Sequence, residues 1–447
     1  MSKVREKAKQ ASWASLKMAT TTSEQRERAL TEIAEAISRE KVSILKENKL
    51  DLEAAKETQS RGDITDSLVK RLKMDEEKIR QIVDMVRSVA AQEDPIGKTL
   101  YAMELDEGFE LYRVSSPIGV VGVIFESRPD ALPQIASLCL KSGNAVILKG
   151  GTEASNSNRV LFDVIEKASR EAGVPEGWIQ LLEDRQEVAE LLELDDYVDL
   201  IIPRGSNSLV RHIEENTRIP VLGHSEGICN IYVDVDADIE KALDVCLDAK
   251  VQYPSVCNAV DTILVHGGVA EEFLPDLKVR FDDAGVEIRG CPITVKLMGG
   301  GVEAASADDW ETEFLDYIVA IKVVSEMDEA IRHINMHSSK HTDAVMTRDG
   351  EAAVKFMEEV DSSSVVWNAS TRFSDGYRYG LGAEVGISTG KVHARGPTGL
   401  EGLTTYKYYL IGTGQMVSSY AGSQAKEFTH RRISKTWKEI KEKLRVS

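Results

Sequence analysis

Residues 117–149 decide the fold class, and they read PIGVVGVIFESRPDALPQIASLCLKSGNAVILK. A continuous apolar run at 118–125 leads into a helical segment near 131–140, and a second apolar run follows at 145–148. Strands that are apolar without alternation are typical of parallel sheets, because crossover helices bury both faces of such a sheet. The pattern continues with apolar runs at 178–182 and 198–202 and helical segments near 153–171 and 186–193. These residues predict a doubly wound α/β domain.

A second α/β series follows residue 227, and we place the boundary between the two domains near residue 225. Its expected strands lie at 231–233, 262–265, 286–288, 317–324, 344–346 and 365–367, with helices near 238–249 and before residue 337. Short apolar strands that alternate with helical segments again favour a parallel sheet. The chain is therefore expected to hold two α/β domains.

The first hundred residues are expected to be helical. Thr22 and Gln25 have the spacing of a capping box, and Leu30, Ile33 and Ile37 then recur on one helix face. This pattern predicts a packing layer that carries no visible chemistry.

Two alternating segments predict a small antiparallel flap. Residues 101–116 contain two short alternating runs around the Asp-Glu-Gly at 106–108, which is a hairpin signal. Residues 403–410 read LTTYKYYL and alternate like an edge strand, and we expect this strand to pair with the hairpin. An exposed strand invites a partner strand, so the flap is expected to serve oligomerisation and the protein to be a homo-oligomer.

Composition excludes several classes of protein. The chain has 447 residues and a formal charge of −19, which disfavours approach to a nucleic acid. No stretch approaches the roughly 20 uncharged apolar residues that span a bilayer, and the first residues lack the apolar core of a secretory signal. Five scattered cysteines argue against a disulfide framework and against a zinc site. We therefore expect a cytoplasmic protein without nucleic-acid or membrane partners.

The last segment, from residue 421, is basic although the rest of the chain is acidic. It carries eight Lys or Arg residues against three Glu residues. A charge run of this kind is most often a solvated helix or tail. We expect residues 421–447 to form a basic C-terminal tail.

Two strand ends are candidates for ligand binding, because ligands of α/β sheets lie at the carboxyl ends of strands and anions favour helix N-termini. One is Arg204-Gly205-Ser206, directly after a buried strand. The other is residues 148–152, LKGGT, where two glycines suit close approach of a phosphate or ribose but also suit a tight turn. The GxGxxG fingerprint is absent, and GISTGK at 386–391 is one residue short of a P-loop.

Cys257 is the candidate nucleophile, in the turn-forming stretch QYPSVCNA at 252–259. A free cysteine is more often a small buried hydrophobe, but a thiol in a polar loop can be held as thiolate and attack a carbonyl carbon. Cys139, Cys229, Cys246 and Cys291 are expected to be structural. The histidines form no HExxH motif and no GxSxG elbow is present, so neither metal catalysis nor a Ser-His-Asp hydrolase is expected.

Four long segments carry a resemblance to a known family. They are FSDGYRYGLGAEVGIST at 373–389 with HARGP at 393–397, SPIGVVGVIFESRP at 116–129, the Cys257 stretch, and residues 324–343. Together they resemble the gamma-glutamyl phosphate reductase family, also called glutamate-5-semialdehyde dehydrogenases, which is a branch of the aldehyde dehydrogenase superfamily. The matches span roughly residues 10–415.

The resemblance implies an aldehyde dehydrogenase-like fold, an α/β architecture of two doubly wound parallel-sheet domains plus a small β-strand oligomerisation flap. Residues 1–100 and 117–225 are then expected to bind NADP, and residues 226–400 to form the catalytic domain with the Cys nucleophile. Residues 101–116 and 401–420 correspond to the flap. These divisions agree with the boundaries drawn from the strand and helix patterns.

The resemblance also implies roles for individual residues. Cys257 is similar to the nucleophile, with Asn258 beside it in the catalytic set, and Lys149 to the lysine that contacts the adenosine ribose. Gly205 and Ser206 resemble the start of the helix beneath the pyrophosphate. Glu313 matches the glutamate that holds the nicotinamide ribose.

Three departures from the wider superfamily sharpen the expectation. The position of the glutamate that activates water is Gly223 here, so hydrolysis of a thioester is expected to be slow unless Glu226 reaches back into the site. The oxyanion-hole Asn aligns with Arg128, which can bind an acyl phosphate or instead form a salt bridge to Glu126 or Asp130. The acidic residue that favours NAD is replaced by Thr152, which predicts NADPH.

The implied activity is reduction of L-glutamyl 5-phosphate by NADPH to L-glutamate 5-semialdehyde and phosphate, through a Cys257 thioester, in proline biosynthesis. A separate glutamate 5-kinase is then the expected partner that supplies the acyl phosphate. The alternatives are a non-phosphorylating aldehyde dehydrogenase, an acyl-CoA reductase, or a silent binding protein. Arg372, His393 and Arg395 are nominated for the substrate's amino and carboxylate groups, each with a structural role as the alternative.

Overall fold

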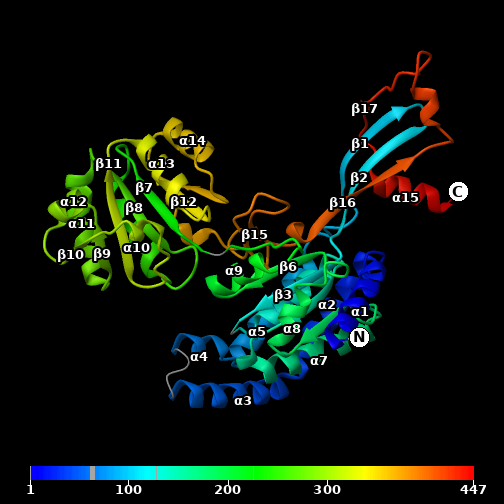
Figure 1. The fold of residues 1–447 in the computed structure, drawn as a ribbon, viewed down its shortest axis with the longest axis horizontal. Coiled ribbons are helices and arrows are strands. Elements are labelled where there is room, and N and C mark those ends of the chain that lie inside the picture. The colour runs from blue at the N-terminus through cyan, green and yellow to red at the C-terminus, as the bar shows by residue number, and fades with distance from the viewer. Residues whose placement is uncertain (1, 61–65, 127, 225, 447) are drawn as a thin grey trace.

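The computed structural model describes residues 2–60, 66–126, 128–224 and 226–446. Three lobes are visible in Figure 1: an N-terminal lobe, a second lobe coloured green to yellow, and a flap that projects from the N-terminal lobe. Each lobe is built on its own sheet. Among the described residues, every helix is too short or too polar to cross a lipid bilayer.

The N-terminal lobe contains a four-stranded parallel sheet in the order β5-β4-β3-β6. Its strands are β3 (Val120–Phe125), β4 (Ala145–Lys149), β5 (Ile179–Leu182) and β6 (Leu200–Arg204). Its helices are α1 (Lys3–Met18), α2 (Ser23–Arg39), α3 (Lys41–Ser60), α4 (Asp66–Leu72), α5 (Glu76–Ala91), α6 (Ala131–Lys141), α7 (Ser155–Glu171), α8 (Gln186–Leu191) and α9 (Asn207–Glu215). All four strands coincide with the predicted apolar runs.

Helices cover both faces of this sheet, as a doubly wound fold requires. Val121 and Val123 pack with α2, α5, α6 and α7 on one face, whereas Val120 and Ile124 pack with α1, α8 and α9 on the other. The capping prediction for α2 is confirmed, since the Thr22 side chain accepts a hydrogen bond from the Gln25 N–H at 3.2 Å. The predicted α/β fold class is therefore confirmed in this lobe.

The second lobe contains a seven-stranded parallel sheet in the order β10-β9-β11-β8-β7-β12-β13. Its strands are β7 (Cys229–Val233), β8 (Val260–His266), β9 (Glu287–Gly290), β10 (Val302–Ala304), β11 (Ile318–Val324), β12 (Thr342–Met346) and β13 (Ser364–Trp367). Its helices are α10 (Ile239–Val251), α11 (Ala270–Asp283), α12 (Pro292–Met298), α13 (Met327–His337) and α14 (Gly350–Glu359).

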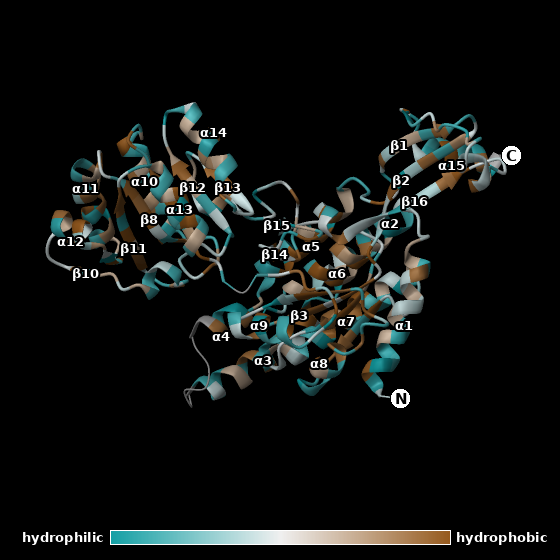
Figure 2. Cartoon of the chain, turned by 45° about the horizontal axis from the view of Figure 1, so that its top comes forward, coloured by the Kyte–Doolittle hydropathy of each residue, from teal (hydrophilic) through white to brown (hydrophobic). Residues whose placement is uncertain are grey.

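Adjacent residues of β7 face opposite sides of this sheet. Ile231 and Val233 pack with α10 and α11, whereas Tyr232 packs with α13 and α14. Figure 2 shows hydrophobic residues concentrated on the strands of both lobes, with hydrophilic residues on the outer helix surfaces. The continuous apolar runs thus reflect burial on both faces.

The chain returns to the N-terminal lobe before residue 400, which differs from the expected catalytic domain of 226–400. Ala383, Val385, Leu400 and Leu403 are buried in the core of the N-terminal lobe. Between them, β14 (Gly386–Ser388) and β15 (Gly396–Thr398) form a short antiparallel pair. The physical reason for the difference is that these apolar side chains fill the first core and not the second.

The flap is an antiparallel sheet in the order β16-β2-β1-β17, with β1 (Thr99–Asp106), β2 (Phe109–Pro117), β16 (Thr404–Ile411) and β17 (Arg431–Arg432). The hairpin is confirmed, and β16 pairs with β2 as predicted. Part of the segment expected as a basic tail packs on the flap, because β17 pairs with β1 and α15 (Trp437–Val446) lies against the sheet. Buried Tyr112 and Val114 contact Ile440 and Trp437 there, which accounts for the difference.

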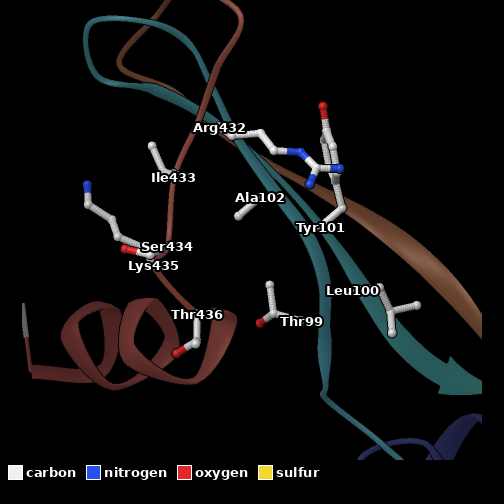
Figure 3. Close-up of a pocket in the computed structure, with 9 residues that line it drawn as sticks. All are labelled: Thr99, Leu100, Tyr101, Ala102, Arg432, Ile433, Ser434, Lys435 and Thr436. Atoms are coloured by element: carbon white, nitrogen blue, oxygen red, sulfur yellow. The ribbon is translucent and has the colours of Figure 1, made fainter.

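A cavity of about 240 Å³ lies in the flap, between β1 and residues 432–436 (Figure 3). Its lining includes Leu100, Tyr101 and Ile433, and the Arg432 guanidinium lies over the Tyr101 ring at 5.0 Å. Cys257 is not among its lining residues. The site around this cysteine must therefore be built from its own contacts.

Candidate active site

Cys257 lies in the loop between α10 and β8, and side-chain to backbone hydrogen bonds hold this loop. The Asn258 side chain donates to the Ser374 carbonyl at 2.8 Å, and the Thr371 hydroxyl donates to the Asn258 carbonyl at 2.8 Å. Thr371 belongs to η3 (Thr371–Phe373), in the segment that leads back to the N-terminal lobe. Asn258 therefore positions the loop beside the thiol.

Gly227 approaches the Cys257 loop more closely than any other residue type allows. A Cβ at Gly227 would lie 2.4 Å from the Cβ of Cys257 and 2.4 Å from its carbonyl oxygen. Contacts this short do not occur between real side chains, so glycine is required where the linker between the lobes crosses the loop. The linker and the candidate nucleophile are thus fixed together.

The environment of Cys257 favours the neutral thiol. Burial raises the pKa of Cys257 to about 12, and the charges of Glu313 and Glu384 add to this shift while Arg372 opposes it. The polar loop alone therefore does not hold a thiolate, which the sequence had left open. A proton acceptor is needed before the sulfur can attack a carbonyl carbon.

Two histidines that the sequence did not assign to the site lie beside this thiol. A ring nitrogen of His224, a ring nitrogen of His341 and the Cys257 sulfur lie within 4.8 Å of one another. The two rings meet edge to face, with 5.0 Å between their centroids. No local motif connects these residues, so only the folded chain brings them together.

Arg128 follows β3 and lies at the edge of the sheet where β6 ends. Its side chain is 49% exposed and donates to Asp130 Oδ2 at 3.3 Å, which corresponds to the salt bridge that the sequence left as an alternative. The Glu126 carboxylate instead accepts from the Ser206 N–H at 2.7 Å. About half of the Arg128 side-chain surface is thus exposed.

Arg204 and Glu384 join Arg128 at this edge. Arg204 ends β6 directly beside Phe125 of β3, and burial together with the nearby Arg128 lowers its pKa. Glu384 accepts from the Gly376 N–H at 2.8 Å, and burial raises the pKa of Glu384 while Arg204 opposes the shift. The sequence placed Arg204 at a strand end but assigned neither residue to the site.

The contacts of Glu226 do not support a role as the base that activates water. Its carboxylate pairs with Arg211 of α9. A Cβ at Gly223, where the resemblance expects the superfamily's water-activating glutamate, would lie 3.1 Å from the Pro203 ring. The arrangement thus places the only acidic side chain of residues 223–227 against an arginine of the N-terminal lobe.

The residues expected to bind the adenosine end of a dinucleotide lie at the end of β4. Lys149 is 4% exposed and donates to the Gly150 carbonyl at 2.5 Å. Burial lowers the pKa of Lys149, and Glu153, whose carboxylate lies against Gly151, opposes that shift. Thr152 is exposed at the start of η1 (Thr152–Ala154).

The expected pyrophosphate site lies at the end of β6, on the same edge of the sheet, because β4 and β6 both pair in parallel with β3. Gly205 and Ser206 precede α9, and within the described residues the Ser206 side chain makes no capping hydrogen bond. A Cβ at Gly205 would lie 2.4 Å from the Glu126 carboxylate. A glycine before a helix N-terminus without a side-chain cap suits an anion, and in this structure the Glu126 carboxylate takes the Ser206 N–H there.

Glu313 spans the two lobes. Its carboxylate accepts from the Asn207 side chain of α9 at 3.2 Å, and its charge acts on Cys257. Burial raises the pKa of Glu313, and the hydrogen bonds from Asn207 and from the Gly227 backbone oppose this shift. A carboxylate between helix α9 and the thiol fits the expected contact with a nicotinamide ribose.

The three nominated substrate residues occupy different environments. Arg372 is 7% exposed, donates to Gln252 Oε1 at 3.1 Å and acts electrostatically on Cys257. Arg395 is bonded to Asp361, with 3.0 Å to its carbonyl oxygen and 3.2 Å to its carboxylate. His393 is exposed, with a φ of 71°. Only Arg372 is held beside the thiol by the contacts described.

Comparisons with known proteins identify the family of the chain. A model of the aldehyde dehydrogenase family matches residues 1–289. A gamma-glutamyl phosphate reductase of Natronomonas pharaonis is 56% identical over 424 residues, which are 95% of this chain and 96% of that protein. The chain belongs to the aldehyde dehydrogenase family, among the gamma-glutamyl phosphate reductases. The family resemblance and the predicted fold are thus confirmed, and the chain is an oxidoreductase of this family.

Further relatives cover nearly the whole chain. A gamma-glutamyl phosphate reductase of Methanococcoides burtonii is 50% identical over 442 residues, 98% of each protein. The crystal structure of a gamma-glutamyl phosphate reductase from Thermotoga maritima has a TM-score of 0.89 and 39% identity, and covers 93% of this chain and 100% of that one. An acetylating aldehyde dehydrogenase from Geobacillus thermoglucosidasius, at 17% identity and a TM-score of 0.65, shares the fold.

Proposed function

We propose that this chain reduces L-glutamyl 5-phosphate to L-glutamate 5-semialdehyde and phosphate with NADPH, as a step of proline biosynthesis from glutamate. The observation that carries the proposal is the identity of 50–56% to gamma-glutamyl phosphate reductases over at least 95% of the chain. The proposed substrate is thus the acyl phosphate for which those relatives are named.

The nucleophile of the proposed reaction is Cys257. Its sulfur attacks the acyl carbon, the carbon–oxygen bond to phosphate breaks, and a thioester forms. A thioester accepts hydride more readily than a carboxylate does, so covalent catalysis divides a difficult reduction into two easier steps. Arg128 and Arg204 supply positive charge at the edge of the N-terminal sheet that suits an acyl phosphate.

The fate of the thioester distinguishes this reaction from that of hydrolytic aldehyde dehydrogenases. Gly223 has no side chain to activate water, and the Glu226 carboxylate is paired with Arg211. Both features support slow attack by water on the thioester, so that the acyl group exchanges with phosphate instead. The proposed phosphate-dependent reaction requires that water attack the thioester only slowly.

Bound NADPH supplies the hydride. Lys149, Gly205, Ser206 and Glu313 are the residues that hold the cofactor in this proposal, at the two strand ends and between the lobes. Thr152 adds no negative charge where a 2′-phosphate would lie, which favours NADPH over NADH. Glu153 lies in the same turn, and its negative charge would repel a 2′-phosphate. Glu153→Gln is therefore expected to lower the KM for NADPH below the wild-type value.

The remaining assignments concern substrate, partners and compartment. Arg372 is the proposed contact for the substrate carboxylate, because it is the nominated residue that acts on Cys257. A separate glutamate 5-kinase supplies the acyl phosphate, the flap mediates homo-oligomerisation, and the enzyme works in the cytoplasm. These proposals extend the expectations from the sequence.

The reverse reaction tests the proposed function. Purified protein is mixed with glutamate 5-semialdehyde and NADP⁺, and NADPH formation is followed with inorganic phosphate, with coenzyme A, or with neither. Phosphate-dependent reduction of NADP⁺ is the expected result, with weaker reduction of NAD⁺. Turnover without phosphate indicates a hydrolytic aldehyde dehydrogenase, and turnover that requires coenzyme A indicates an acyl-CoA reductase.

A further inference from the structure

The thiol of Cys257 is neutral in its buried setting, and the proposed reaction needs it deprotonated. His224 and His341 are the basic side chains whose ring nitrogens lie within 4.8 Å of its sulfur. A separation of this size allows transfer through one water, or directly after a small side-chain rotation, and catalytic hydrogen bonds are often long before substrate binds. The two histidines are therefore in reach of the proton.

Hydrogen bonding fixes the tautomer of His224. Its Nδ1 lies 2.8 Å from the Ile387 carbonyl oxygen, and a carbonyl can only accept a hydrogen bond, so Nδ1 carries the hydrogen. A neutral ring then has its lone pair on Nε2. Nε2 of His224 is thus the nitrogen left to accept a proton.

His341 supports the first ring from a fully buried position. Its Nδ1 lies 2.9 Å from the Thr342 hydroxyl and 3.7 Å from the Cys229 sulfur. Within the described residues, its Nε2 has no hydrogen-bond partner although the residue is 0% exposed. An unsatisfied nitrogen this deep in the protein calls for an explanation, and a catalytic role is one that fits its place beside His224 and Cys257.

The charges around His224 keep its ring neutral. Burial lowers the pKa of His224, and Arg204 at the end of β6 lowers it further, whereas the Ile387 carbonyl and Glu214 of α9 oppose the shift. His341, on the other side, is itself neutral because burial and the nearby His224 lower its pKa. Both rings are therefore neutral at neutral pH, which leaves each with one nitrogen lone pair.

We propose that His224 takes the thiol proton of Cys257 when the sulfur attacks, and that His341 positions and stabilises the imidazolium that results. This inference rests on the proposed function for its natural substrate. It also explains how the site works without the superfamily's glutamate at position 223. The residue directly after that glycine is His224.

In the proposed reaction, the thiol proton of Cys257 ends on the departing phosphate. The S–H proton passes to Nε2 as the sulfur bonds to the acyl carbon, and His224 then gives it to the departing phosphate, which leaves as hydrogen phosphate. Bound NADPH would supply hydride to the acyl carbon; the resulting oxyanion re-forms the carbonyl as the carbon–sulfur bond breaks, which releases the aldehyde and the Cys257 thiolate. A proton from solvent reaches the thiolate through His224 and restores the thiol.

The test uses p-nitrophenyl acetate, which acylates a thiol without phosphate or cofactor. The initial burst of nitrophenolate is measured in a Cys291→Ser background, with EDTA present to remove adventitious metal and with mass spectrometry to locate the acetyl group. We expect His224→Gln to slow the burst at pH 7 by about 10²-fold, which is typical for loss of a general base. Added imidazole is expected to restore part of the rate.

The pH profile supplies a readout that a merely structural role would not change. The wild-type burst rate is expected to reach a plateau above the lowered pKa of His224, whereas the rate of the variant is expected to rise toward the pKa of about 12 of Cys257. His266→Gln is the control, because His266 lies at the far end of β8 and accepts from the Gly268 N–H. Circular dichroism verifies that each variant is folded.

The outcomes separate this inference from the proposed function. A burst in His224→Gln with wild-type rate and pH profile overturns the role of His224, as does a slow burst that neither imidazole nor high pH restores. If the variant does not fold, the pH profile of the wild type provides the test. A wild-type burst rate that rises steadily from pH 5 to 10 without a plateau also overturns the role of His224. Failure of phosphate-dependent turnover in the wild type, with the burst behaviour intact, rejects only the proposed substrate.

Discussion

Two cysteines of the second lobe lie in surroundings of opposite electrostatic character. Cys291 is the N-cap residue of α12, and hydrogen bonds from Thr294 and from the Val323 N–H outweigh its burial, so its pKa is lowered. For Cys257, burial and two nearby carboxylates raise the pKa to about 12. The more acidic thiol is thus not the proposed nucleophile, which teaches that the proposed catalysis needs groups beside the sulfur that take its proton.

The largest expected effect comes from replacing each sulfur in turn. Cys257→Ser should lower turnover in the phosphate-dependent assay by about 10³-fold or more, because the weaker nucleophile replaces the group that forms the thioester. Cys291→Ser should stay within about twofold of the wild type, since the half-buried Cys291 has none of the contacts described for the site. Steady-state kcat is the measurement, and comparable losses in both variants would erase the distinction.

The second effect tests whether the close packing of Cys257 matters. Gly227→Ala places a methyl group 2.4 Å from the Cβ of Cys257, so the loop must move, and a displacement of about 1 Å typically costs ~10² in rate. Gly300→Ala is the matched control, because the space around Gly300 is open for 4 Å. Normal kcat in Gly227→Ala, with an unchanged melting temperature, would show that the loop tolerates the methyl group.

The third effect concerns the resting thiols and their pH dependence. A thiol reacts as thiolate, and the thiolate fraction falls tenfold for each unit by which the pKa exceeds the pH. Iodoacetamide at pH 8 should therefore label Cys291 at least ~10-fold faster than Cys257, even after allowance for the greater nucleophilicity of the less acidic thiol. Raising the pH toward 10 should narrow the ratio. Site-resolved mass spectrometry measures it, and preferential labelling of Cys257 at pH 8 contradicts the assigned environments.

The smallest expected effect comes from removing the charge of Glu313, a carboxylate that acts on Cys257. Glu313→Gln removes a charge that raises the pKa of Cys257, so labelling of Cys257 should increase several-fold relative to Cys291. The same variant should raise the KM for NADPH by about 10-fold, because a hydrogen-bonding carboxylate is lost between the lobes. Glu303→Gln, on the exposed strand β10, is the control. An unchanged KM together with unchanged labelling would place Glu313 outside the site.

Much of the fold followed from local patterns in the sequence. The apolar runs at 118–125 and 145–148, the hairpin at 101–116 and its pairing with 403–410 all correspond to observed strands. These features are predictable because burial on both faces, or on alternate positions, leaves a pattern within a few residues. The return of residues 383–403 to the N-terminal core left no such pattern, since it depends on which of two apolar cores has room.

The residues of the candidate site likewise fall into two groups, those named from the sequence and those identified only in the structure. Cys257, Lys149 and Glu313 were named from the sequence through the family resemblance, and the structure places them at the loop, the strand end and the junction of the lobes. His224, His341, Arg204 and Glu384 were not assigned, because they lie on separate segments that converge only in the folded chain. A sequence pattern detects spacing along the chain and not distance across it.

The sequence by itself determined the fold class, the family and the identity of the thiol that the proposed chemistry uses. Tertiary structure alone decided the charge state of that thiol, the groups that face it and the lobe to which the residues after 383 belong. The physical reason is that apolar periodicity is a local property, whereas a pKa depends on burial and on charges brought close by distant segments. The residues near Cys257 come from both lobes, so the electrostatic environment of its sulfur forms only when both lobes are folded.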